Sequence, residues 1–187
     1  MSAAISPFWA KGFEATTLSD LEEATGVDRS TIYNSFGGKT GLYRSATAAY
    51  VDRSHEALFE PLHKGTSGIA DIVDFLDRLA TMLGSDVNPP GCLIVNDMAA
   101  DIDHEATNRY LECLQTGFQK ALQRSSSLGD SNPHKTGQRS QTLTAAILGV
   151  NIVHRNSANA SLAQTLIDGL REEVSAWSTE EPVVLPL

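Results

Sequence analysis

The chain has 187 residues, of which 41% are hydrophobic and 20% charged, and it carries a formal net charge of −9. This composition is typical of a folded globular protein and argues against a disordered chain. No apolar run approaches the roughly eighteen residues that a membrane span requires, so no membrane partner is expected. The negative charge argues against a general nucleic-acid binder, because phosphates attract clustered Lys and Arg. The acidity is uneven, however, since residues 1–53 carry five bases and six acids and the remainder carries most of the negative charge.

The two cysteines, Cys92 and Cys113, lack the spacing of a metal or redox motif. Two cysteines in a chain of this size favour reduced thiols in a cytosol over a disulfide framework. The first residues show no basic segment followed by an apolar stretch, so secretion is not expected. These features predict a cytoplasmic protein.

Helical periodicity covers almost the whole chain and no useful stretch alternates like a strand, which predicts an all-α fold of about nine helices. Pro7 would interrupt a first helix that ran through it, so the start of the chain is expected to be shortened, truncated or altered. Ser6 as the N-cap and Pro7 as the first helical residue would give a shortened helix. The segment 125–133 is expected to be a loop, and the tail from Thr179 to be extended or frayed.

Two short helices separated by a Gly-containing turn form the outline of a helix-turn-helix. The pattern Thr17-x-x-Asp20 is a capping box that opens a helix over 17–25. Asp28 can cap a second helix over 29–36. In a helix-turn-helix the first helix braces the second, whose N-terminal side chains enter the major groove of DNA. The second helix is therefore the candidate recognition helix.

The remaining chain carries further apolar stripes at helical spacing. The stripe over 69–83 is so wide that this helix should be covered on two sides. Pro90 follows a turn and could open the next helix, and Asp103 could cap the one after it. The helices expected beyond the recognition helix cover about 39–63, 69–83, 90–98, 103–124, 136–154 and 159–177.

Over about residues 8–50 the chain carries a characteristic series of residues, namely Phe8, Lys11, Gly12, Thr16, Leu21, Ala24, Gly26, Val27, Ile32, Tyr33, Phe36, Lys39 and Leu42. In their order and spacing these residues resemble the DNA-binding domain of the TetR family of bacterial regulators. The resemblance implies a helix-turn-helix domain over 1–46, followed by a ligand-binding and dimerisation domain over 47–187. It also implies a transcriptional regulator, in most cases a repressor, that binds a palindromic operator as a homodimer and is released by a small molecule.

The candidate recognition helix has two apolar residues, Ile32 and Phe36, four positions apart, which leaves a mostly polar outer face. Tyr33 could hold a phosphate or be a core aromatic. Lys39 begins a helix after two glycines, and the free amides at such an N-terminus favour a phosphate. By the resemblance, Thr17, Tyr33 and Lys39 hold phosphates, while Arg29, Ser30, Thr31 and Asn34 reach base edges of double-stranded operator DNA.

The second domain has a surplus of large apolar residues with a few polar ones among them. This pattern fits a pocket with apolar walls for a largely apolar small-molecule effector, although a packed core with satisfied amides fits it too. The candidate pocket residues are Phe75, Met82, Asn96, Met98, Tyr110, Phe118 and Asn151. The last two helices are the expected dimer seam of an isologous four-helix contact, through Leu143, Ile147, Val150, Leu162, Leu166 and Leu170.

Two rival hypotheses come from other classes of protein. An enzyme would use Cys92 or the acidic cluster of Asp101, Asp103, His104 and Glu105, but no nucleophile and base stand at a recognisable spacing. Cys92 fits a small core residue better than a sensor, and the cluster fits an acidic first turn of a helix better than a metal site. No enzyme activity, cofactor or metal is therefore expected. The other rival is a helical interaction protein with weakened DNA binding, which Pro7 and the near-neutral first domain make plausible.

Overall fold

The computed structural model describes residues 2–100, 102–125, 133–156 and 160–179. Within these ranges the chain forms ten α-helices and two short 3-10 helices and contains no strand, which confirms the predicted all-α fold. The helices are α1 (Ser2–Ala15), α2 (Leu18–Thr25), α3 (Arg29–Phe36), α4 (Lys39–Ala57), α5 (Glu60–Lys64), α6 (Ile69–Leu83), α7 (Leu93–Asp97), η1 (Met98–Ala100), α8 (His104–Arg124), α9 (Pro133–Asn156), α10 (Ala160–Ala176) and η2 (Trp177–Thr179).

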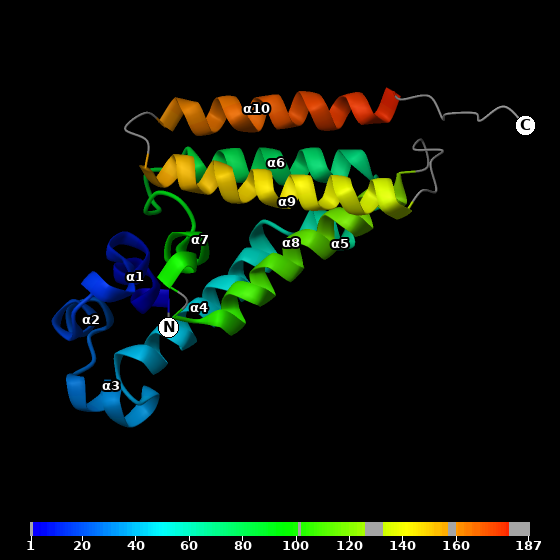
Figure 1. Cartoon of the computed structure of the whole chain (residues 1–187). Coiled ribbons are helices and arrows are strands. Elements are labelled where there is room, and N and C mark those ends of the chain that lie inside the picture. The colour runs from blue at the N-terminus through cyan, green and yellow to red at the C-terminus, as the bar shows by residue number, and fades with distance from the viewer. Residues whose placement is uncertain (1, 101, 126–132, 157–159, 180–187) are drawn as a thin grey trace, which may run out of the picture.

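The helices form a small N-terminal group and a larger C-terminal bundle (Figure 1). Helices α1, α2 and α3 lie together at one end of the molecule, and α4 leads from them into the bundle. In the bundle α8 contacts α4, α5 and α9, while α10 packs on α6 and α9. Helix α3 thus lies at the end of the molecule farthest from α10. None of the described helices is both long and apolar enough to cross a bilayer.

Helix α1 does not begin at Pro7, so the expectation of a shortened helix is wrong. The backbone is helical from Ser2 onwards because Ala4 and Ile5 are buried in the core at 0% and 3% exposure. The irregularity comes instead at Gly12, whose φ of 80° and ψ of 168° are essentially restricted to glycine. The Thr16 hydroxyl donates hydrogen bonds to the carbonyls of Pro7 and Gly12, at 3.1 and 2.6 Å. It therefore binds the carbonyls around this break.

The long helix expected over 39–63 is two helices. Helix α4 ends at Ala57, and the short helix α5 begins at Glu60 with Pro61 in its first turn. Proline has no backbone N–H and is tolerated in the first turn of a helix but not in its interior. Pro61 therefore starts a new helix, and the chain has one α-helix more than the sequence predicted.

Helix α7 begins later than expected. Pro90 lies in the turn before it, Gly91 has a φ of 78°, and Cys92 is the N-cap residue in an extended conformation. A Cβ on Gly91 would lie 2.5 Å from Asn96 Oδ1, so this turn requires glycine. The other expected helices are present with shifted ends, and Asp103 caps α8 by accepting the Ala106 N–H at 3.2 Å.

The core of the bundle contains an aromatic cluster contributed by α6, α8 and Phe59, the residue before α5. The Phe75 and Phe118 rings meet edge to face with centroids 5.3 Å apart, and Phe59 contacts both Phe75 and Tyr110. All four side chains are at most 2% exposed. Most of the expected loop over 125–133, and most of the tail from Thr179, lie outside the described residues.

Candidate nucleic-acid interface

The helix-turn-helix is held in shape by caps at the start of both short helices. Thr17 Oγ1 accepts the Asp20 N–H at 3.1 Å, and Asp20 Oδ2 accepts the Thr17 N–H at 2.8 Å, so the predicted capping box is confirmed. Asp28 Oδ1 accepts the Thr31 N–H at 2.7 Å at the start of α3. Gly26 and Gly37 end the two helices in the left-handed conformation. The ends of α2 and α3 are thus set by contacts between residues a few positions apart.

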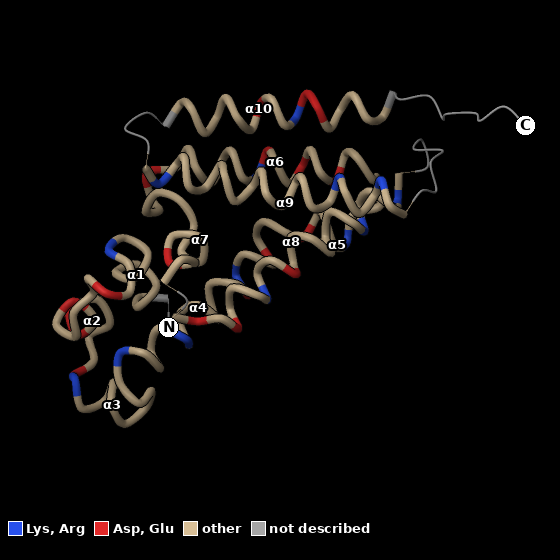
Figure 2. The backbone as a smooth tube through the Cα atoms, viewed as in Figure 1, with Lys and Arg blue, Asp and Glu red and all other residues tan. Residues whose placement is uncertain are grey.

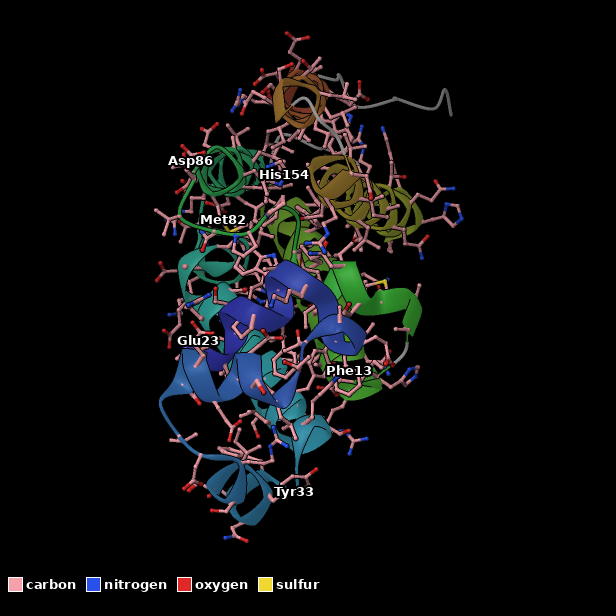
Figure 3. The ribbon with its side chains drawn as sticks, turned by 90° about the vertical axis from the view of Figure 1, so that its left-hand side faces the viewer. Phe13, Glu23, Tyr33, Met82, Asp86 and His154 are labelled. Atoms are coloured by element: carbon pink, nitrogen blue, oxygen red, sulfur yellow. The ribbon has the colours of Figure 1, made fainter. Side chains whose placement is uncertain are left out.

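Helix α3 presents the expected outer face to solvent. Ile32 is fully buried and Phe36 packs partly against the core, as their spacing predicted. Tyr33 is 54% exposed and lies at the tip of the molecule (Figure 3), so it is not a core aromatic. Its ring covers Gly38, where an added Cβ would lie 3.1 Å from Tyr33 Cε1. The other exposed side chains assigned to DNA are Thr17, Arg29, Ser30, Thr31 and Asn34, and their contacts with DNA stay predictions.

Lys39 is placed at the N-terminus of α4 but is already engaged in the free protein. Its Nζ donates to the Glu14 carbonyl at 3.2 Å and lies 4.5 Å from the centroid of the Phe13 ring. The N-cap residue of α4, Gly38, provides no side-chain cap, unlike Thr17 and Asp28. The first amides of α4 are therefore without the side-chain acceptor that α2 and α3 have.

Two cationic side chains near α3, Lys11 and Arg29, form ion pairs with acidic side chains. Lys11 Nζ lies 2.7 Å from Asp20 Oδ1, and this bond, with those from Thr17, lowers the pKa of Asp20 to about 2. Glu22 accepts the Arg29 N–H at 2.7 Å and also contacts its guanidinium at 3.5 Å. Sequence reasoning missed the role of Glu22, because its contact with Arg29 exists only once the turn between α2 and α3 has folded.

Two further residues, Asp97 and Arg155, join the N-terminal helices to the bundle, and no local sequence pattern indicates their contacts. Asp97, at the end of α7, accepts the Phe13 N–H and the Tyr43 hydroxyl, both at 3.0 Å. Burial and the nearby Asp97 charge raise the pKa of Tyr43, so the phenol stays protonated and donates. From the end of α9, Arg155 donates to the carbonyls of Trp9 and Ala10 at 3.1 and 3.2 Å. Arg155 thus joins α1 to α9.

The seven residues expected to line an effector pocket differ in their surroundings, and a shared pocket stays a prediction. Phe75, Tyr110 and Phe118 fill the core against one another, and Asn151 is 1% exposed with its Nδ2 donating to the Ile147 carbonyl of its own helix. The packed-core alternative therefore describes these four better. Asn96 and Met98 are half-buried, Asn96 donates to the Pro90 carbonyl, and Met82 lines a small hollow on another side.

The expected dimer seam is part buried and part exposed. Leu143 and Ile147 are 2% and 0% exposed because α9 turns them into its own bundle, so their place in a seam is corrected. Leu162 and Leu166 are 48% and 39% exposed. An apolar groove of about 470 Å³ runs between α9 and α10 and is lined by Ala146, Gly149, Val150, Val153, Thr165, Leu166, Gly169 and Leu170.

Neither enzyme hypothesis gains support from the geometry. Cys92 is buried, Tyr50 donates to its sulfur at 3.4 Å, and burial raises the pKa of the thiol. Asp103 is used as a helix cap and also accepts the Thr47 hydroxyl, while Asp101 lies outside the described residues. In the part of the chain that is described, no three His, Cys, Asp or Glu residues gather closely enough to hold a metal ion.

Comparison with known proteins gives related regulators. The family model described as bacterial regulatory proteins, tetR family, matches residues 1–46. The HTH-type transcriptional repressor ComR of Escherichia coli (strain K12) is 30% identical over 169 residues, covering 85% of this chain and 79% of ComR. The HTH-type transcriptional regulator YezE of Bacillus subtilis (strain 168) is 26% identical and covers 88% of this chain and 89% of YezE.

Solved structures show the same fold at lower identity. The TetR family transcriptional regulator CifR, as a cysteine mutant complexed with 26-base-pair operator DNA, has a TM-score of 0.76 at 19% identity, covering 91% of this chain and 92% of CifR. A TetR transcriptional regulator from Chloroflexus aurantiacus has a TM-score of 0.77 at 19% identity, covering 96% and 92%. With ComR 30% identical over most of both chains, this chain belongs to the TetR family and is a DNA-binding transcriptional regulator rather than an enzyme.

Proposed function

We propose that this regulator is a repressor that binds a palindromic operator as a homodimer and leaves it when a small molecule binds. The observation that carries the proposal is α3, a helix with its apolar side buried at Ile32 and its polar face exposed at one end of the molecule. Such a helix can enter a major groove without any rearrangement of its core. Two copies would have to present α3 roughly 34 Å apart to meet half-sites one helical turn apart.

The N-terminus of α4 supports a phosphate contact beside this helix. Its first amides lack a side-chain cap, and free N–H groups at a helix N-terminus attract anions. Lys39 stands at the same turn and would exchange its exposed contact with the Glu14 carbonyl at 3.2 Å, and its place over the Phe13 ring, for a phosphate. A cation at this place would strengthen binding to any DNA sequence.

The outer surface of α9 and α10 supports a dimer. Residues 140–153 of α9 and 160–167 of α10 contain no charged side chain, and Figure 2 shows both stretches without Lys, Arg, Asp or Glu. Ile152 and Leu162 are about half exposed on these helices, at 51% and 48%. Exposed apolar residues beside an apolar groove mark a protein contact more often than a free surface. A second copy of this chain is the occupant that twofold symmetry favours.

The names of the relatives agree with this proposal. ComR is named a transcriptional repressor, and CifR was solved on double-stranded operator DNA. The rival hypothesis of an interaction protein with weakened DNA binding loses one of its two grounds, because α1 continues through Pro7. Its other ground, the near-neutral charge of the first domain, makes the affinity for DNA the quantity to measure.

The DNA test uses fragments from beside the gene of this protein in a gel shift and in fluorescence anisotropy at several salt concentrations. We expect Lys39→Ala to weaken binding evenly across sequences and to lower the salt slope by about one. Lys64→Ala, in the bundle, is the matched control and should leave the slope unchanged. Asn34→Ala should instead alter the base preference. Absence of any sequence-selective binding by the unaltered protein would contradict the proposed function.

The dimer test places a charge in the groove. Leu166→Glu should give a monomer in analytical ultracentrifugation and lower operator affinity, because burying an unpaired carboxylate in an apolar contact is unfavourable. Val87→Glu is the control, since Val87 is 88% exposed in the segment after α6. A Leu166→Glu protein that is still a dimer would show that the copies meet elsewhere.

A further inference from the structure

A hollow of about 180 Å³ lies where three helices from both parts of the molecule meet. Trp9 of α1 and Tyr50 of α4 form its aromatic wall, and Leu58 and Met82 complete the apolar lining. Figure 3 shows Met82 at the end of α6, on the side that faces the N-terminal helices. The hollow is separate from the aromatic core and from the groove between α9 and α10. It therefore lies between the N-terminal helices and the bundle.

Trp9, which lines this hollow, carries a buried hydrogen-bond donor that has no acceptor in the protein. Trp9 is 3% exposed, and its indole Nε1–H has no acceptor. A buried donor without an acceptor is unfavourable, so most native structures give such a group a partner. The backbone of the same residue is fixed, because Arg155 donates to the Trp9 carbonyl at 3.1 Å. The backbone of α1 is thus held at the residue whose indole N–H lacks a partner.

The only charged side chain lining the hollow is a cation. Arg53 of α4 is exposed and makes no hydrogen bond or ion pair with the described residues. The polar lining is completed by Ser54 and Asn88, and no acidic side chain contributes to it. This is unexpected in a chain with a net charge of −9.

A second hollow shows what a balanced lining looks like. It has a volume of about 350 Å³ and lies between α4 and the start of α8, where Arg44 and Arg109 face Asp103 and Glu105. Arg109 is moreover paired with Asp52. The charges there neutralise one another within the protein, whereas Arg53 and the Trp9 N–H have no such partner. Of these two hollows among the described residues, the one at Trp9 has donors for an anion and no acidic side chain in its lining.

We propose that the hollow at Trp9 binds a small carboxylate with an apolar tail and that this is where the effector acts. The carboxylate accepts hydrogen bonds from the Trp9 indole N–H and the Arg53 guanidinium, a charge-assisted pair of donors. The tail lies against Leu58 and Met82. The volume equals that of about six water molecules and is smaller than the roughly 300 Å³ of drug-sized sites, so the acid is short.

The place of the hollow connects binding to DNA affinity. Trp9 belongs to α1, which packs on α2 and α4, while Met82 belongs to α6 of the bundle. A ligand held by both would favour one arrangement of α1 against the bundle, and only such a difference in affinity between two arrangements can shift the protein off DNA. This step depends on the proposed repressor function, whereas the binding step does not.

The binding step is tested by the fluorescence of Trp9. The chain has two tryptophans, so Trp177→Phe leaves Trp9 as the only one. Hexanoate should change its emission saturably, while hexan-1-ol and hexylamine should not. Arg53→Gln should weaken hexanoate binding at least about tenfold, the effect of losing one charged hydrogen bond. Arg44→Gln, which also removes an exposed arginine of α4, should leave the binding unchanged.

The site is overturned if hexanoate gives no saturable change, if hexan-1-ol binds equally well, or if Arg53→Gln binds hexanoate as tightly as the parent. The effector role is tested by adding hexanoate to the protein on its operator, where release is expected for the parent and not for Arg53→Gln. Binding of hexanoate without release would overturn the effector role alone. Failure to bind any operator, with hexanoate still bound, would overturn the proposed function and leave the site intact.

Discussion

The helix-turn-helix and the C-terminal bundle are held together by different forces. Helices α2 and α3 have eight residues each, and each fully buries a single apolar residue, Leu21 and Ile32. Helices α6 and α8 each bury seven residues. In α2 and α3, hydrogen bonds of capping side chains take the place of apolar area. The stability of the DNA-facing helices therefore depends on a few polar contacts, whereas that of the bundle depends on apolar packing.

This difference suits the two tasks of a regulator. A recognition helix must keep its outer face free, so it cannot be stabilised by burying that face. Caps such as Asp28 fix such a helix from its ends and leave the sides available. The helices of the bundle can bury any face that does not have to contact a partner or a ligand.

Packing in the bundle predicts the largest loss of stability. Phe118→Ala removes a fully buried ring that meets Phe75 edge to face at 5.3 Å. Such a replacement costs about 3–5 kcal/mol through lost burial and the cavity left behind. Urea unfolding should show this loss, and Val87→Ala, at an 88% exposed position, should show none. A cost below about 1 kcal/mol would mean that Phe118 lines an open pocket, as the sequence suggested, and would contradict the packed core.

The same comparison explains what the sequence could predict. The capping box of Thr17 and Asp20, the Asp28 cap and the burial of Ile32 were all predicted, because each depends on residues within a few positions of one another. Residues this close in the sequence are also close in the folded chain, so the contact can be predicted without knowledge of the fold. The exposed face of α3 followed directly from it.

The sequence could not distinguish core from pocket or seam. Phe75 and Ile147 carry the apolar pattern of any buried residue, and only the crossing of the helices decides which neighbours they meet. The contact of Asp97 with Phe13 joins residues 84 positions apart, so no local pattern announces it. The boundary between α4 and α5 is predictable from the sequence, because Pro61 would be unfavourable in the interior of one long helix.

The contact between the two regions predicts an intermediate effect. Gly12→Ala puts a side chain on a residue whose φ of 80° and ψ of 168° are essentially restricted to glycine, at a cost of about 1–3 kcal/mol. The new Cβ would also lie 3.1 Å from Asp97 Oδ1. Hydrogen exchange should show the Phe13 amide losing protection. Gly137→Ala is the control, because it lies inside α9 with open space around it and should stabilise the chain.

A smaller effect is predicted at the cap of the recognition helix. Asp28→Ala removes the acceptor of the Thr31 N–H and should cost about 1 kcal/mol. Operator affinity should fall more than global stability, because only α3 loses its anchor. Asp28→Ser keeps an acceptor and should restore both, measured by urea unfolding and fluorescence anisotropy. Equal affinity for DNA in Asp28→Ala would show that the cap does not position α3.

The smallest effect is a dependence on pH at the start of α2. The bond from Lys11, followed by those from Thr17, lowers the pKa of Asp20 from 3.8 to about 2. Because the pKa is lower in the folded state, the contribution of Asp20 to stability is complete above about pH 4 and is lost as the pH falls towards 2. The difference in stability between the parent and Asp20→Asn should therefore shrink over this range. Carbon-detected NMR should place the Asp20 titration near pH 2, and Lys11→Met should move it towards 3.8. A midpoint that stays at 2 in Lys11→Met would assign the shift to the capping box alone, and the N-terminal helices would then depend on even more local contacts than we infer.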